Sequence, residues 1–138
     1  MAGRLRVMLV DDNPAVRAGE AALLEDSPVA ELVGACEAPE QAVGLAGTLK
    51  PDVILVDLLL ESGDGFNLAS TLRERDCGSL FVLFTAIDHR SELMSSALTR
   101  GFHGYLSKSA AASDLEDCLA TVGSGGYWLD GPPEAVAI

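Results

Sequence analysis

Residues 50–60 read KPDVILVDLLL, with a proline, then four consecutive apolar residues and an aspartate. The run 53–56 is too short for a helix, and its continuous apolar character is typical of a strand that is buried on both faces. Such strands occur in parallel sheets whose two faces are covered by helices. Asp57 is therefore predicted at the carboxyl end of a buried parallel strand, which is the edge where these sheets bind ligands.

Apolar runs and helix-like segments alternate on both sides of this stretch. Five β/α units predict one α/β domain with a doubly wound, five-stranded parallel sheet in the order 2-1-3-4-5. Asn13 and Pro14 suit the start of a helix, and Gly101 suits a helix end. Strands are predicted at 4–10, 30–36, 53–56, 80–85 and 104–107, and helices at 14–25, 39–49, 66–75, 91–100 and 113–122.

Composition narrows the class of protein. The 138 residues suit a single domain, and the net charge of −12 argues against a nucleic-acid-binding surface. No apolar run is long enough to span a membrane, and the N-terminus lacks a signal-peptide pattern, so we expect a soluble cytoplasmic protein with no membrane partner. The three cysteines, Cys36, Cys77 and Cys118, are expected to be reduced packing residues.

Polar side chains stand where four of the predicted strands end. Asp11 and Asp12 follow the first strand, Asp57 the third, Thr85 closes the fourth and Lys108 follows the fifth. Three neighbouring carboxylates repel one another unless a cation neutralises them, and Mg²⁺ is the cation that best suits such oxygen ligands. Taken singly, the Asp pair also fits a strand-end turn, Thr85 a strand residue and Lys108 a surface lysine. Their shared position at one sheet edge favours a site for a metal ion and a phosphoryl group.

The residues of this edge also suggest a reaction. A carboxylate such as that of Asp57 can act as a nucleophile and form an aspartyl-phosphate. Lys108 would place a positive charge at a phosphoryl oxygen, and Thr85 would donate its hydroxyl to another.

The motifs VDDN, KPDVILVDLLL, DG, LFTA and GYLSK together resemble the receiver domain of two-component response regulators, over about residues 4–122. The resemblance implies a flavodoxin-like, three-layer α/β/α fold. It also implies that Asp57 accepts a phosphoryl group from a histidine kinase or phosphotransfer protein. Asp12, Asp57 and the main-chain carbonyl of Leu59 would bind Mg²⁺ directly, and Asp11 would act largely through water.

The same resemblance implies a conformational switch. Thr85 and Lys108 would hold the phosphoryl group, and Tyr105 would turn inward as Thr85 moves toward it. This would re-form the face made by the fourth helix, the fifth strand and the fifth helix. The chain would then be no enzyme in the ordinary sense, because it would catalyse only its own phosphorylation and dephosphorylation.

The end of the chain resembles the NarL-like subclass, in which a linker leads to a LuxR-type helix-turn-helix. Residues 123–138, rich in Gly and Pro, are expected to begin such a linker, and the output domain is missing. DNA would be bound only through that domain, and phosphorylation would favour a homodimer, by a face that the sequence does not choose. The alternative is a stand-alone receiver that acts through protein contacts.

Three departures from the family pattern affect the loops. Glu61 and Ser109 replace prolines that the family usually has, and Leu59 and Ile87 are apolar where the attacking water would pass. We expect the apolar residues Leu59 and Ile87 to slow loss of the phosphoryl group. His89 and His103 have no partners at metal-ligand spacing.

Three rival functions are less favoured. A phosphatase of the haloacid-dehalogenase type would carry an Asp-x-Asp pattern after the first strand, but this strand ends Asp11-Asp12-Asn13. A flavin or nucleotide binder would have a Gly- or Ser/Thr-rich loop there rather than an acidic one. A degenerate receiver would lack some of the five site positions, all of which are present.

Overall fold

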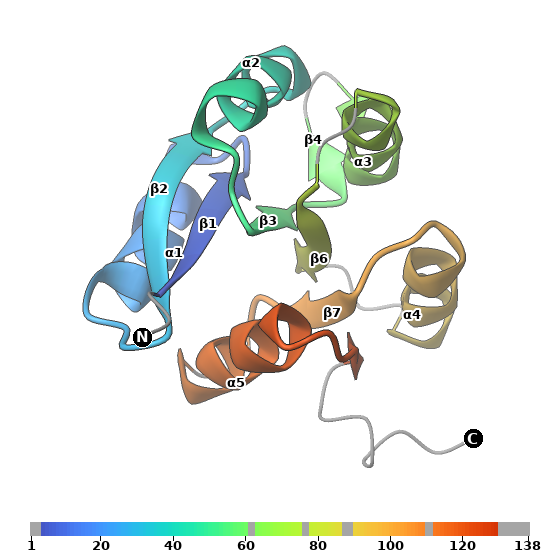
Figure 1. Ribbon diagram of the computed structural model, residues 1–138. Helices are drawn as coiled ribbons and strands as arrows, with labels where there is room; N and C mark the ends of the chain where they lie inside the picture. Colours follow the sequence, from blue (N-terminus) through green and yellow to red (C-terminus); the bar gives the residue numbers. More distant parts are fainter. Residues whose placement is uncertain (1–3, 61–62, 76–77, 87–89, 110–111, 130–138) are drawn as a thin grey trace.

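The computed structural model describes residues 4–60, 63–75, 78–86, 90–109 and 112–129. Six parallel strands form one sheet in the order β2-β1-β3-β6-β7-β8, with helices on both faces (Figure 1). Four residues with roles in the sequence analysis, Glu61, Cys77, Ile87 and His89, lie outside the described ranges.

Ten of the elements match the predicted ones in order and type. The five predicted strands lie in the predicted order. Their bounds are β1 (Leu5–Val10), β2 (Ala30–Cys36), β3 (Val53–Val56), β6 (Leu80–Thr85) and β7 (Gly104–Ser107). The helices are α1 (Pro14–Glu25), α2 (Pro39–Leu49), α3 (Gly65–Glu74), α4 (Arg90–Thr99) and α5 (Ala112–Gly123).

Alternation along each strand divides the core into two layers. Val7 and Leu9 of β1 face one apolar cluster, and Met8 and Val10 face the other, as the two-residue period of a strand requires. The first cluster contains buried residues of α1 and α5, and the second contains those of α2, α3 and α4. The sheet is therefore covered on both faces, as its continuous apolar strands predict.

Local signals fix the ends of the helices as expected. The side chain of Asn13 accepts hydrogen bonds from the backbone N–H groups of Ala15 and Val16, at 3.0 and 3.1 Å, and so caps α1. Gly101 adopts a φ of +84° just after α4, where a side chain would be strained.

The prediction of a five-stranded sheet is wrong by one strand. β8 (Trp128–Leu129) adds to the edge, parallel to β7, with Gly104 opposite Trp128 and Tyr105 opposite Leu129. The physical reason is that Trp128 is buried in the cluster on the α5 side of the sheet. A strand of two residues within a Gly-rich segment is too short to give a periodic signal. The division into 4–122 and 123–138 stays a prediction.

The segment after β3 also differs from its prediction. β4 (Leu59–Leu60) and β5 (Gly63–Asp64) form a small antiparallel pair between β3 and α3, where no strand was predicted. The backbone N–H of Gly65 donates to the carbonyl of Leu58 at 2.9 Å, which brings the two arms together, and α3 begins at once. Within the described ranges no helix has the length and apolar character that a bilayer crossing requires.

Candidate functional site

The backbone carries the acidic residues of β1 and β3 to one edge of the sheet. The N–H of Asp11 donates to the carbonyl of Cys36 on β2, and the N–H of Asp57 donates to the carbonyl of Val10, both at 3.1 Å. The ladder of sheet hydrogen bonds thus continues up to both aspartates and fixes their main chain. Asp11 and Asp57 therefore lie together at the carboxyl ends of β1 and β3, as predicted.

Three carboxylates meet at this edge. Asp11, Asp12 and Asp57 each offer one oxygen, and these oxygens lie within 4.8 Å of one another. Asp11 is buried, whereas Asp12 and Asp57 are partly exposed and leave the cluster open to solvent. An open cluster of hard oxygen donors fits a divalent cation that keeps part of its water shell, as Mg²⁺ does. These are the residues from which the sequence predicted a metal site.

Lys108 pairs with two of the three carboxylates in this structure. Its ammonium Nζ donates to Oδ2 of Asp57 at 2.8 Å and to Oδ2 of Asp11. Its backbone N–H donates to the carbonyl of Thr85 at 3.0 Å, so that β6 holds the base of the side chain. Burial alone would lower the pKa of Lys108, but the hydrogen bonds to Asp11 and Asp57 outweigh it and raise that pKa. The ammonium is therefore charged at neutral pH and lies at the nucleophile candidate.

Asp11 is held as a charged carboxylate. Burial on its own would raise the pKa of Asp11, but the neighbouring Glu20 carboxyl, Lys108 and the backbone N–H of Asn13 lower it below its usual value. The Asn13 N–H donates to Oδ1 of Asp11 at 3.0 Å. The guanidinium of Arg17 also donates to the main-chain carbonyl of Asp11 at 2.8 Å, which ties α1 to the site.

Glu20 is a member of the site that the sequence analysis missed. Its side chain projects from α1, is 6% exposed, and its Oε1 lies 3.6 Å from Nζ of Lys108. Among the described residues, no hydrogen bond of standard geometry reaches either carboxyl oxygen, although the carboxyl group of Asp11 lies close by. Burial, and then the proximity of Asp11, raise the pKa of Glu20 to about 8. The signal was present in the sequence, because Glu20 precedes the buried Leu24 by four residues and so shares its inward helix face.

The remaining predicted residues lie beside this cluster. Thr85 is buried at the end of β6, opposite Ser107 of β7. Tyr105 is buried in the core cluster on the α4 side of the sheet, so its side chain already lies inward. Leu59 is in β4, two positions after Asp57. The roles given to these three residues, including the carbonyl of Leu59 as a metal ligand, stay predictions.

Comparisons with known proteins match most of the chain to one family. Residues 7–120 match the model of the response regulator receiver domain family. The chain is 34% identical over 119 residues to the nitrate/nitrite response regulator protein NarL of Escherichia coli K12, and this alignment covers 86% of the chain and 55% of NarL. It is 34% identical over 122 residues to the transcriptional regulatory protein LiaR of Bacillus subtilis 168, and this alignment covers 88% of the chain and 57% of LiaR.

A solved structure shows the same fold. The LuxR-family two-component response regulator from Aurantimonas sp. SI85-9A1 superposes with a TM-score of 0.85 at 27% identity, over 95% of this chain and 91% of that one. The chain spans only a little more than half the length of NarL and LiaR. The match over 7–120 shows that this chain belongs to the receiver domain family of two-component response regulators and is related to their LuxR-type members.

Proposed function

We propose that the chain is a phospho-acceptor switch in which Asp57 receives a phosphoryl group from a histidine kinase or phosphotransfer protein. The observation that carries the proposal is the convergence of Asp11, Asp12 and Asp57, with the Lys108 ammonium 2.8 Å from Asp57. Asp57 follows a fully buried strand, and its side chain is 13% exposed, so that a donor can reach its oxygen.

The transfer uses the residues already in place. A carboxylate oxygen of Asp57 forms a bond to phosphorus while the bond from phosphorus to the donor nitrogen breaks, and that nitrogen keeps the electron pair. Lys108 then exchanges its bond to Asp57 for one to a phosphoryl oxygen, and Thr85 donates its hydroxyl to another. Both residues stabilise charge that develops on the phosphoryl oxygens.

Receiver domains generally bind Mg²⁺, and the donor set of this site suits that ion. Asp12 and Asp57, with the main-chain carbonyl of Leu59, would hold it directly, and Asp11 would act largely through water. The bound ion would offset the negative charge that gathers between the carboxylates and the incoming phosphoryl group.

The output is proposed to pass through the face formed by α4, β7 and α5. Movement of Thr85 and Tyr105 would re-form this face, favour a homodimer, and control a LuxR-type DNA-binding domain outside these 138 residues. The relatives support this, because one is named a transcriptional regulatory protein. A stand-alone receiver acting through protein contacts is the second candidate.

The test is the intact mass of the protein after incubation with Mg²⁺ and acetyl phosphate. We expect a gain of one phosphoryl group in the wild type, and no gain with EDTA or in Asp57→Asn. Asp52→Asn is the matched control, because Asp52 precedes β3 at the opposite end of the sheet and should leave phosphorylation intact. A wild type that stays unmodified with both acetyl phosphate and a panel of phosphorylated histidine kinases would contradict the proposal.

The same sample separates the switch from a phosphatase. A phosphorylated switch releases one phosphate per chain, at a rate set by the lifetime of the aspartyl-phosphate. A phosphatase would release many equivalents from a generic phosphate monoester such as p-nitrophenyl phosphate. We expect no such turnover.

A further inference from the structure

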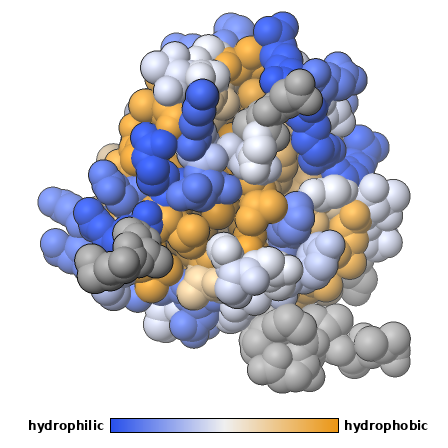
Figure 2. All heavy atoms as spheres, in the orientation of Figure 1, coloured by the Kyte–Doolittle hydropathy of each residue, from blue (hydrophilic) through white to orange (hydrophobic). Residues whose placement is uncertain are grey.

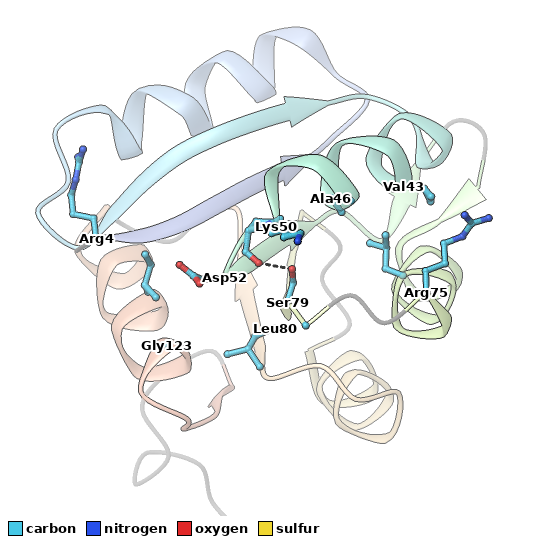
Figure 3. Close-up of a pocket in the computed structure, with 14 residues that line it drawn as sticks. Arg4, Val43, Ala46, Lys50, Asp52, Arg75, Ser79, Leu80 and Gly123 are labelled. Carbon is cyan, nitrogen blue, oxygen red and sulfur yellow. Dashed lines mark hydrogen bonds between the residues drawn. The ribbon is translucent and has the colours of Figure 1, made fainter. Parts of the chain in front are cut away.

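A second concave site lies at the opposite end of the sheet from Asp57. A cavity of about 870 Å³ opens at the amino ends of the central strands, where it is bordered by Leu5 of β1, Leu80 of β6 and the end of α2. Figure 3 shows Lys50 and Ser79 near its middle, with Arg4 and Arg75 on opposite sides. None of the residues that line it belongs to the site around Asp57.

The floor of this cavity is apolar. Leu5, Val43 and Leu80 are only partly buried and line it together with the buried Ala46 and Leu72. On the face shown in Figure 2, apolar surface lies in the middle and hydrophilic residues border it. A cavity of this volume, with apolar side chains on its floor and charged side chains beside them, falls within the usual range of about 300–1,000 Å³ for small-molecule sites.

Three of the four charged residues that line the cavity are basic, whereas the protein as a whole is acidic. The chain carries a net charge of −12, yet Arg4, Lys50 and Arg75 line the cavity. The fourth, Asp52, is acidic, and its carboxylate accepts the backbone N–H of Arg6 at 2.8 Å. Arg4 reaches Glu31 at 3.8 Å. Within the described part of the chain, neither Lys50 nor Arg75 has an acidic side chain within ion-pair distance.

Lys50 also has an unusual backbone. It ends α2 with a φ of +49°, and it is the one residue other than glycine with a positive φ in the described ranges. Glycine is the residue that adopts this conformation without strain. The carbonyls of Leu49 and Lys50 accept the guanidinium of Arg6, so the ammonium of Lys50 is not needed to cap the helix. A strained, unpaired lysine over an apolar floor points to a ligand.

We propose that this cavity binds a small organic anion that has an apolar body and one acid group. The body would cover Leu5, Leu72 and Leu80, and the acid group would pair with Lys50. Arg4 and Arg75, at the rim, would attract the anion over a longer range. This inference goes beyond the phospho-acceptor function and does not depend on it.

Two fluorescent probes test the proposal on the full 138-residue chain. 8-Anilino-1-naphthalenesulfonate has an aromatic body and a sulfonate, and N-phenyl-1-naphthylamine has the same body without the charge. We expect saturable binding of the sulfonate, tighter than binding of the neutral probe. Raising the salt concentration should weaken only the binding of the sulfonate, because salt screens its attraction to the cations.

Substitutions then locate the probe. Lys50→Gly keeps the favoured backbone conformation and removes the ammonium, so it should weaken sulfonate binding by roughly threefold to fivefold without lowering the melting temperature. Arg75→Gln should act in the same direction. Gly47→Leu places a side chain at the cavity, where an added Cβ meets nothing within 4 Å, and should weaken both probes by more than tenfold. Gly44→Leu, on the same helix and equally open, does not line this cavity and is the control.

The outcomes are distinct from those of the phosphorylation test. Asp57→Asn should bind the sulfonate as the wild type does, whether or not the wild type accepts a phosphoryl group. The proposal is overturned if Gly47→Leu leaves sulfonate binding unchanged. It is overturned equally if Lys50→Gly and Arg75→Gln weaken both probes to the same extent, or if the wild type shows no saturable binding.

Discussion

The ammonium of Lys108 is surrounded by the carboxyl groups of Asp11, Asp57 and Glu20. Replacing it by methionine, which has a similar length but no charge, leaves these carboxyl groups facing one another. Breaking a mostly buried ion pair in this way costs about 3 kcal/mol. We expect Lys108→Met to lower the midpoint of urea unfolding in EDTA, and Mg²⁺ to restore more stability in this variant than in the wild type. Lys50→Met, at the other lysine, is the control, and equal effects of Mg²⁺ on all three proteins would contradict the prediction.

Glu20 makes stability depend on pH. Its pKa is raised from 4.5 to about 8 in the folded protein, so between these values the unfolded chain has released a proton that the folded chain retains. The folded state therefore loses stability, relative to a variant without the carboxyl group, as pH rises from 4.5 to 8. We expect the free energy of unfolding of Glu20→Gln to rise relative to that of the wild type by on the order of 1 kcal/mol for each pH unit in this window.

Urea unfolding in EDTA at pH 5, 6.5 and 8 measures this gain. Glu25→Gln, on the exposed side of the same helix, is the control and should differ from the wild type by a constant amount. If the difference in unfolding free energy between Glu20→Gln and the wild type stays constant from pH 5 to pH 8, Glu20 ionises as an ordinary carboxyl group.

At the scale of elements, the start of α3 sets the position of Asp57. A Cβ added to Gly65 would lie 2.7 Å from a methyl group of Val56 and would also press on the carbonyl oxygen of Asp57. We expect Gly65→Ala to destabilise the fold by about 1–3 kcal/mol and to weaken Mg²⁺ binding, because the Asp57 loop must shift. Gly44→Ala meets no atom within 4 Å in α2 and should stabilise by about 0.5–1 kcal/mol. Urea unfolding and Mg²⁺ titration calorimetry check both, and a Gly65→Ala protein with unchanged Mg²⁺ affinity would contradict the coupling.

The sequence predicts the elements well where one local signal controls them. The apolar run Val53–Val56 can only be a buried strand, and Asn13 caps the helix whose start it marks. The convergence of Asp57 and Lys108 follows from strand order, because parallel strands end at one edge. Glu20 was missed because a carboxyl group on a helix is usually solvated, although its four-residue spacing from Leu24 places it on the buried face of α1.

β8 was missed for a different reason. Its two residues carry no periodic pattern, and it is held by contacts with distant parts of the chain. The N–H of Trp128 donates to the carbonyl of His103 at 3.0 Å, and the ring of Tyr127 stacks on that of His103 at 5.4 Å. Such pairing depends on the shape of the completed sheet edge, which no short stretch of sequence contains.

At the scale of the whole molecule, the two ends of the sheet carry different chemistry. The carboxyl end gathers three aspartates and one lysine, and the amino end has a cavity with an apolar floor that Lys50 and Arg75 also line. The strands between them are buried, so a ligand at the amino end would not compete with a phosphoryl group at Asp57. Only a change in the packing of the sheet and helices would couple the two sites.

The extent of the folded unit gives the last prediction. A receiver that ended near residue 122, as the sequence suggests, would lose nothing when the chain is cut after Gly126. In the structure this cut removes Trp128, which is 5% exposed and packs in the same cluster as Leu119 and Val122. It also removes the backbone partners of Gly104 and Tyr105 at the edge of β7. Loss of a buried tryptophan typically costs about 3–5 kcal/mol.

We therefore expect a chain of residues 1–126 to unfold at a clearly lower urea concentration than the full 138 residues, and a chain of residues 1–129 to match the full chain. Circular dichroism is the measurement, because the chain has a single tryptophan and the cut removes it. Equal midpoints for the two shortened chains would place the end of the receiver at α5 and leave β8 as part of the linker. A lower midpoint for 1–126 alone would make β8, whose Leu129 lies opposite Tyr105, part of the receiver.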